Sequence, residues 1–379
     1  MKYINSIRNL GKLHQKELPI LTPGMNKSID KHRYAELDAL RGFAALMVVS
    51  FHYTMQYCNN NVNLFRYGVT GVDLFFIISG FVIFMSINNV NSGKEFIINR
   101  FARLYPVYWV CLTMSFLLTM YEVCIDLHHT VTMDWIIRYL ANLTMWQYYF
   151  DIPNMEGPYW SLLIELLFYV LIFALYKLNQ LKRIEPILFG LVLLQMTLLI
   201  LERLHPYNAQ LKIIIANERF FPLIQFLALF LIGIVFYKII TFKATLFRCL
   251  IICICFFEQV VEYDYKLTYA RFNTLQWQYA IILGCFILIF ILFTRNSLKF
   301  IVTRSTRLLG RISYPLYLFH QYVSIYYLIP FFSNRLHLPY AISCICSLVI
   351  VITSAGLITV YIDEPIRTKI KKRFLIKEH

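Results

Sequence analysis

An arginine and a histidine lie inside one apolar segment near the start of the chain. The segment ELDALRGFAALMVVSFHY covers residues 36–53 and contains Arg41 and His52. Ionisable side chains inside a membrane span cost roughly 2.5–3.5 kcal/mol each, so they indicate a function. Eleven residues make three helical turns, which puts both side chains on nearly the same face, about 16 Å apart along the axis. This spacing predicts a groove with a cation near one end and a titratable base near the other.

His52 has the chemistry of a general base, because a neutral imidazole can take a proton from a hydroxyl group. The alternative is a histidine that only packs and has its ring nitrogens satisfied by neighbours. His320 lies in a later apolar segment, seven residues after Ser313, and competes with His52 for the role of base.

Two carboxylates are predicted to lie near the outer membrane face. Asp73 begins the second apolar segment, and Glu165 lies about one turn into the fourth. His52, Asp73 and Glu165 could then share one vestibule, where a carboxylate orients the imidazole and stabilises its protonated form. Asp73 could instead cap its helix, whereas Glu165 lies too far into its segment for capping.

Two more arginines precede the third apolar segment. Arg100 and Arg103 are three residues apart and lie on one side of a helical turn at the expected cytoplasmic face. Guanidinium groups match phosphate oxygens, so Arg41, Arg100 and Arg103 are expected to bind the phosphates of an anionic donor. Arg100 and Arg103 could also be ordinary cytoplasmic anchors. We expect no metal site, because no cysteine or histidine spacing indicates one.

Ten apolar segments are available to position these residues. A membrane-spanning helix needs about 20 predominantly apolar residues. The segments that meet this length are roughly 38–57, 72–89, 104–121, 159–177, 186–203, 220–240, 245–262, 278–294, 313–332 and 341–362. The interrupted stretch 133–150 is expected to be an interfacial or re-entrant helix. The predicted fold class is all-α, a polytopic integral membrane bundle of about ten transmembrane helices.

Composition and charge distribution agree with a membrane protein. Of the 379 residues, 59% are hydrophobic, whereas soluble chains are about 45–50% apolar. The net charge of +15 arises from lysines and arginines gathered at the chain ends and in alternate loops. Under the positive-inside rule both termini are cytoplasmic, and no nucleic-acid partner is expected. We predict a disordered basic tail at 1–34, a membrane domain at 35–366 and a second basic tail at 367–379.

Several motifs occur in order along most of the chain. They are LDALRGFAALMVVSFHY (37–53), GVDLFFIISGFVIF (71–84), RFARLYPVYW (100–109), YWSLLIELLFY (159–169), LGRISYPLYLFH (309–320) and DEPIR (363–367). Together they resemble the multispanning acyltransferase type-three family, typified by bacterial O-antigen and surface-polysaccharide O-acetylases. The resemblance implies transfer of an acyl group, commonly acetyl from acetyl-CoA, to a hydroxyl of a carbohydrate or similar acceptor at the outer face. It also implies a multi-pass protein of the bacterial inner membrane, with lipid and acyl-CoA as partners.

The resemblance places the family's functional residues by position on Arg41, His52, Arg100, Arg103, Trp160, Ser161 and Glu165. With Asp73 and His320, which come from the argument on the residues above, this gives three groups of expected site residues. The residues expected to be catalytic are His52, Asp73 and Glu165. Those expected to bind the acyl-CoA donor are Arg41, Arg100 and Arg103. Those expected to contact the substrate are Trp160, Ser161 and His320. Leu166 stands where the family usually has a second glutamate.

Two other classes of function are compatible with the residues alone. A transporter or flippase would use the buried charges to line a substrate or proton path. A membrane sensor or scaffold would use them only for helix packing. Consumption of a thioester by the purified protein distinguishes the enzyme from both.

Overall fold

Helices build the structure, a computed structural model that describes residues 34–55, 65–126, 133–216, 220–265 and 275–375. The helices in these ranges are α2 (Ala35–Met55), α3 (Gly71–Asn88), α4 (Gly93–Tyr121), α5 (Met133–Asn142), α6 (Trp160–Lys177), α7 (Ile184–Leu204), α8 (Ala209–Ala216), α9 (Leu227–Thr241), α10 (Leu246–Glu262), α12 (Gln276–Thr294), α13 (Arg304–Tyr322), α14 (Tyr340–Ile358) and α15 (Glu364–Leu375). Short 3-10 and π-helical turns extend or join several of them. No strand occurs in these ranges, so the predicted all-α class is confirmed for them.

Seven helical segments in the described part of the chain are long and apolar enough to cross a membrane. They contain α3, α4, α6, α7, α9, α12 and α14. The other three segments predicted to span fall on α2, α10 and α13. Helix α10 has 17 residues, and α2 and α13 carry charged side chains such as Arg41 and Arg311. A helical protein with several candidate membrane spans is therefore confirmed, while the count of ten stays a prediction.

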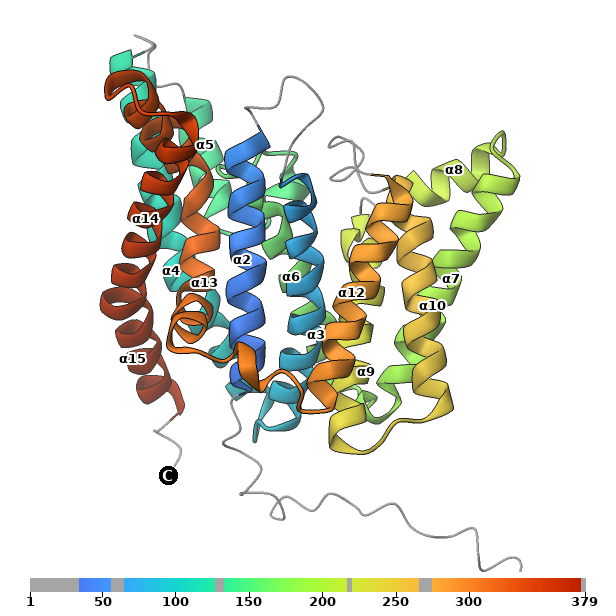
Figure 1. The fold of residues 1–379 in the computed structure, drawn as a ribbon. Helices are drawn as coiled ribbons and strands as arrows, with labels where there is room; N and C mark the ends of the chain where they lie inside the picture. The colour runs from blue at the N-terminus through green and yellow to red at the C-terminus, as the bar shows by residue number, and fades with distance from the viewer. Residues whose placement is uncertain (1–33, 56–64, 127–132, 217–219, 266–274, 376–379) are drawn as a thin grey trace, which may run out of the picture. The chain divides into compact units, whose positions relative to one another are not determined.

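Two groups of helices meet along α3 (Figure 1). Helices α2, α4, α6, α13 and α14 lie on one side, and α7, α9, α10 and α12 lie on the other. Most residues of α3 and α9 are buried, and these two helices pack against each other. Helices α7, α12 and α14 expose large apolar side chains, including Leu194, Ile281 and Ile345. Such an exposed apolar surface is typical of helices that face lipid.

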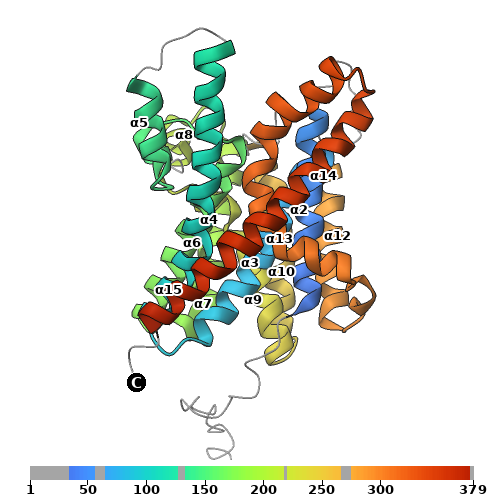
Figure 2. The same cartoon turned by 90° about the vertical axis from the view of Figure 1, so that its left-hand side faces the viewer.

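Helix α2 begins and helix α15 ends at the lower end of the bundle in Figure 1. The predicted basic tail at 367–379 starts as part of α15, which packs against α4 (Figure 2). Residues 1–33 of the predicted N-terminal tail, and residues 376–379, lie outside the described residues. The side of the membrane on which the termini lie stays a prediction.

An ion-paired glutamate joins three helices of the second group. Glu185 of α7 contacts Lys238 Nζ of α9 at 2.7 Å and Arg248 Nε of α10 at 2.8 Å. All three side chains are largely buried. Removing one partner of such a buried set would leave an uncompensated charge, which is strongly destabilising. The set therefore ties α7, α9 and α10 together near one end.

Helices α2 and α13 run parallel and approach closely at two glycines. A Cβ added to Gly310 would lie 2.1 Å from the Asp38 carbonyl oxygen, and one added to Gly42 would lie 2.7 Å from Leu309 Cβ. Small residues let membrane helices approach each other in this way. His52 and His320, each ten residues beyond its glycine, are again in contact, with ring centroids 4.9 Å apart. The register of α2 on α13 is therefore the same at both ends.

Gly310→Ala should destabilise the protein, because the new methyl group meets backbone rather than a movable side chain. Overpacking of this kind costs about 1–3 kcal/mol, which thermal unfolding in detergent would measure. Gly190→Ala on α7 is the matched control, since no atom lies within 4 Å of its added Cβ. A Gly310→Ala protein as stable as the control would contradict the close packing of α2 on α13.

Candidate functional site

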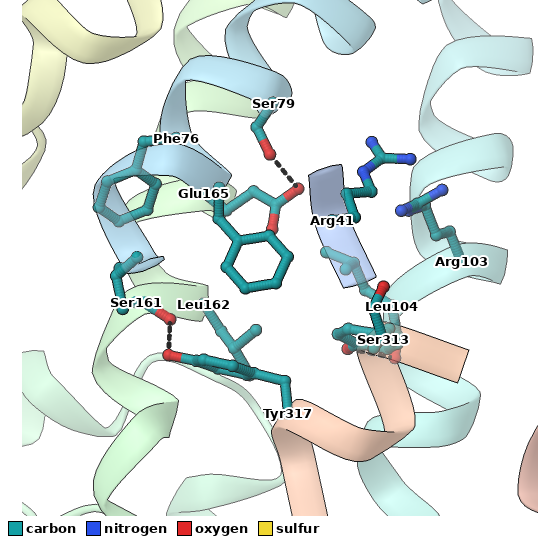
Figure 3. Close-up of a pocket in the computed structure, with 13 residues that line it drawn as sticks. Arg41, Phe76, Ser79, Arg103, Leu104, Ser161, Leu162, Glu165, Ser313 and Tyr317 are labelled. Carbon is teal, nitrogen blue, oxygen red and sulfur yellow. Dashed lines mark hydrogen bonds between the residues drawn. The ribbon is translucent and has the colours of Figure 1, made fainter. Parts of the chain in front are cut away.

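A cavity lies between five helices of the first group (Figure 3). Its volume is about 60 Å³, enough for a few water molecules. Helices α2, α3, α4, α6 and α13 line it. The lining residues are Arg41, Val72, Phe75, Phe76, Ser79, Arg103, Leu104, Ser161, Leu162, Glu165, Ser313, Tyr314 and Tyr317.

Two guanidinium groups form one side of this cavity. Figure 3 shows the side chains of Arg41 and Arg103 next to each other. Asp38 is the acidic partner of Arg41, with Oδ1 3.7 Å from Nη1. Arg103 makes no hydrogen bond or salt bridge with the described residues. This side of the cavity can therefore bind an anion.

Arg100 lies behind the cavity and does not line it. Its Nη2 donates to Ser86 Oγ at 2.8 Å, and its guanidinium lies over the rings of Phe96 and Tyr169. The two arginines of the Arg-x-x-Arg motif therefore have different surroundings. Arg103 faces the cavity, and Arg100 supports its wall.

Among the residues that the structure describes, Glu165 is the one carboxylate that lines the cavity, and it lies beside the arginines. Oε1 accepts hydrogen bonds from Tyr169 Oη at 2.5 Å and from Ser79 Oγ at 3.4 Å. Figure 3 shows Glu165 between Ser79 and Arg41. The expected vestibule shared by His52, Asp73 and Glu165 is not what the structure contains, because Glu165 has guanidinium neighbours instead.

Hydroxyl groups form the opposite side of the cavity. Ser161 Oγ and Tyr317 Oη are 2.7 Å apart, and Tyr317 Oη donates to the Pro158 carbonyl oxygen at 3.0 Å. Ser161 thus lines the cavity. Trp160 packs against Phe226 in a tilted arrangement, with ring centroids 5.4 Å apart, and does not line the cavity.

The two histidines predicted as rival bases contact each other. His320 Nε2 lies 3.1 Å from His52 Nδ1. His320 is fully buried, and its ring centroid is 6.0 Å from that of Tyr317. Neither histidine lines the cavity. Tyr317 is therefore the lining residue that neighbours the histidine pair.

Asp73 lies on a different face of α3 from the cavity residues. Its fully buried carboxylate is a neighbour of the Tyr279 hydroxyl of α12, together with Glu258 and Glu262 of α10. Val72 and Phe76 of the same helix line the cavity. The structure therefore groups Asp73 with the second set of helices and not with His52.

Ser79, Tyr169 and Tyr317 contribute to the site and were not expected from the sequence. Tyr169 is four residues after Glu165, and Tyr317 is three residues before His320. Residues at these spacings are neighbours on a helix surface, so the partners of an intramembrane ionisable group could be sought there. Ser79 belongs to another helix, and no local spacing indicates it.

Comparisons with known proteins match this chain to acyltransferases. The family model described as "Acyltransferase domain" matches residues 34–359. A Bacillus subtilis (strain 168) protein named "Putative peptidoglycan O-acetyltransferase YrhL" is 31% identical over 185 residues, 43% of this chain and 27% of that protein. An Acidianus two-tailed virus protein named "Putative acetyltransferase ORF330" is 25% identical over 163 residues, 41% of this chain and 45% of that protein. The chain thus spans less than half of each relative's length. No solved structure matches.

Tyr169→Phe should destabilise the protein, because it removes the hydroxyl that donates to Glu165. A hydrogen bond to a charged group contributes about 1.5–3 kcal/mol, and thermal unfolding in detergent would measure the loss. Tyr176→Phe on the same helix is the control, since its hydroxyl makes no hydrogen bond within the described residues. Equal stability of the two variants would mean that Tyr169 does not hold Glu165.

Proposed function

Because this chain belongs to the acyltransferase domain family, whose model matches residues 34–359, we propose that it is a membrane O-acyltransferase. It moves an acyl group, acetyl in our proposal, from acyl-CoA on the cytosolic side to a hydroxyl at the outer face. The observation that carries the proposal is the cavity itself. One side is lined by Arg41 and Arg103, and the other ends at Tyr317, next to the histidine pair.

The arginine side of the cavity binds the donor in this proposal. Coenzyme A carries phosphates, and Arg103 has a guanidinium free of hydrogen bonds and salt bridges among the described residues. Arg41 adds a second positive group beside it. The cavity of about 60 Å³ is far smaller than the roughly 300–1,000 Å³ of a drug-sized pocket. The nucleotide therefore stays at the arginine end, and only the acyl-bearing arm passes between the helices.

His52 acts as the general base on the acceptor hydroxyl. The O–H bond breaks and its proton moves to the imidazole, while the oxygen bonds to the thioester carbonyl carbon. The C–S bond then breaks, and the leaving thiolate takes the proton back from the imidazolium. Glu165 orients the guanidinium groups in this scheme, and Asp73 has no role at the reacting atoms.

The acceptor is a carbohydrate or a similar hydroxyl compound of the cell envelope. The name of the B. subtilis relative refers to peptidoglycan, which makes peptidoglycan the first acceptor to assay. The proposal includes ten spans, both termini in the cytoplasm and a bacterial inner-membrane location. The start of α2 and the end of α15 at one end of the bundle support the shared side of the termini (Figure 1).

His52→Ala should lower the rate of acetyl transfer by about 10²–10⁴-fold, the usual contribution of a positioned general base. Purified protein, labelled acetyl-CoA and peptidoglycan fragments would measure this rate. His205→Ala is the matched control, because His205 is exposed beyond the end of α7. Full transfer by His52→Ala would refute the base. Labelled donor crossing a vesicle membrane without thioester consumption would instead favour a transporter.

Arg103→Gln should raise KM for acetyl-CoA about tenfold or more, since a charge-assisted contact to phosphate is lost. Its kcat should change less, because the reacting atoms lie at the other end of the cavity. Arg304→Gln, which changes an exposed arginine at the start of α13, is the control. An unchanged KM for acetyl-CoA in Arg103→Gln would exclude this arginine from donor binding.

A further inference from the structure

A chain of hydrogen bonds runs from the backbone of α13 through His320 to His52. Nδ1 of His320 lies 2.9 Å from the Tyr317 carbonyl oxygen and 3.2 Å from that of Leu316. A carbonyl oxygen can only accept, so this Nδ1 must carry a hydrogen. A neutral imidazole has one N–H, which leaves Nε2 of His320 with a lone pair.

The next link fixes the hydrogen on His52. Nδ1 of His52 lies 3.1 Å from His320 Nε2 and 2.9 Å from the Val48 carbonyl oxygen. Both neighbours are acceptors, so Nδ1 of His52 is the donor. A doubly protonated His320 would require a lone pair on His52 Nδ1, which would then face the Val48 oxygen at 2.9 Å. When both rings are neutral, each donor in this series of hydrogen bonds faces an acceptor.

We propose that His320 is a positioning residue that, together with the Val48 carbonyl oxygen, holds His52 in its Nδ1–H tautomer, so that Nε2 of His52 is the atom that takes the proton from the acceptor hydroxyl. The role of Nε2 rests on the proposed function, whereas the tautomer stands on the hydrogen bonds alone. Both hydrogen bonds of the His52 ring use Nδ1, so Nε2 makes none with the described residues. His320 has both ring nitrogens occupied and is fully buried, so it is neither the base nor a substrate contact.

The chain also stabilises the charge that forms during transfer. When Nε2 of His52 takes the hydroxyl proton, the ring becomes an imidazolium whose Nδ1–H still donates to His320 Nε2 and the Val48 oxygen. Hydrogen bonds to the charged form favour it. The acceptor oxygen bonds to the thioester carbon, the C–S bond breaks, and Nε2 returns the proton to the thiolate. His320 keeps its own proton throughout.

The tautomer can be measured without any activity. The test is long-range ¹H–¹⁵N correlation at neutral pH on full-length protein labelled with ¹⁵N-histidine, with His52 assigned from its Ala variant. We expect a protonated Nδ1 and an unprotonated Nε2 on His52. His320→Gln, whose Oε1 can still accept from His52, should keep this pattern. His320→Phe leaves the Val48 oxygen as the one acceptor described for Nδ1, so it should raise the fraction of the Nε2–H form without making that form dominant. A wild-type His52 with hydrogen on Nε2, or an unchanged pattern in His320→Phe, overturns the inference.

Kinetics distinguish positioning from a merely structural role. His320→Phe should lower kcat about 10–100-fold, as loss of a residue that orients a functional histidine does, with KM for acetyl-CoA unchanged. His320→Gln should recover most of kcat. Equal losses in Phe and Gln variants that keep wild-type thermal stability would overturn positioning by hydrogen bonding. Full transfer by His52→Ala would overturn the proposed function and the role of Nε2, while the spectra would still report the tautomer.

Discussion

The parallel packing of α2 on α13 is the contact on which the rest of the site depends. It places the Arg41 region of α2 beside Gly310, and ten residues further along it brings His52 to His320. Helix surfaces repeat every 3.6 residues, so a shift of one residue would turn either histidine away by about 100°. The glycines at one end and the imidazole hydrogen bond at the other therefore specify the same register. One register of α2 on α13 thus allows both the close packing at the glycines and the hydrogen bond between the histidines.

The charged side chains around the cavity other than Arg103 have partners suited to their place. Asp38 accompanies Arg41, and Tyr169 and Ser79 donate to Glu165. Arg100 is fixed by Ser86 and two aromatic rings. Buried charges are tolerated only when they are paired and hydrogen-bonded. With these groups held, the guanidinium of Arg103 is the one at the cavity that is left to bind an anion.

The types of the site residues and their depth in the membrane could be predicted from the sequence. The helix face that each residue occupies and the residue that it contacts could not. Arg41 and His52 could be recognised because ionisable groups are costly inside apolar segments. Asp73 follows Val72 directly, yet the two side chains point about 100° apart on a helix, so a prediction from depth alone put Asp73 in the wrong group. The contact of His52 with His320 joins residues 268 positions apart, and no local spacing reports it. The all-helical fold, by contrast, follows from apolar segments long enough to cross a bilayer.

Tyr317 links the two halves of the proposed reaction path. Its ring lines the cavity and neighbours His320, and its hydroxyl is held by Ser161 and the Pro158 carbonyl oxygen. In the proposed reaction, an acyl group that moves from the arginine end toward His52 meets this ring, because Tyr317 lines the cavity. The two hydrogen bonds oppose that movement by about 0.5–1.5 kcal/mol each, which is small beside the cost of separating packed helices. Rotation of the Tyr317 side chain therefore costs less than separating the helices, and the α2–α13 contact can stay intact while it occurs.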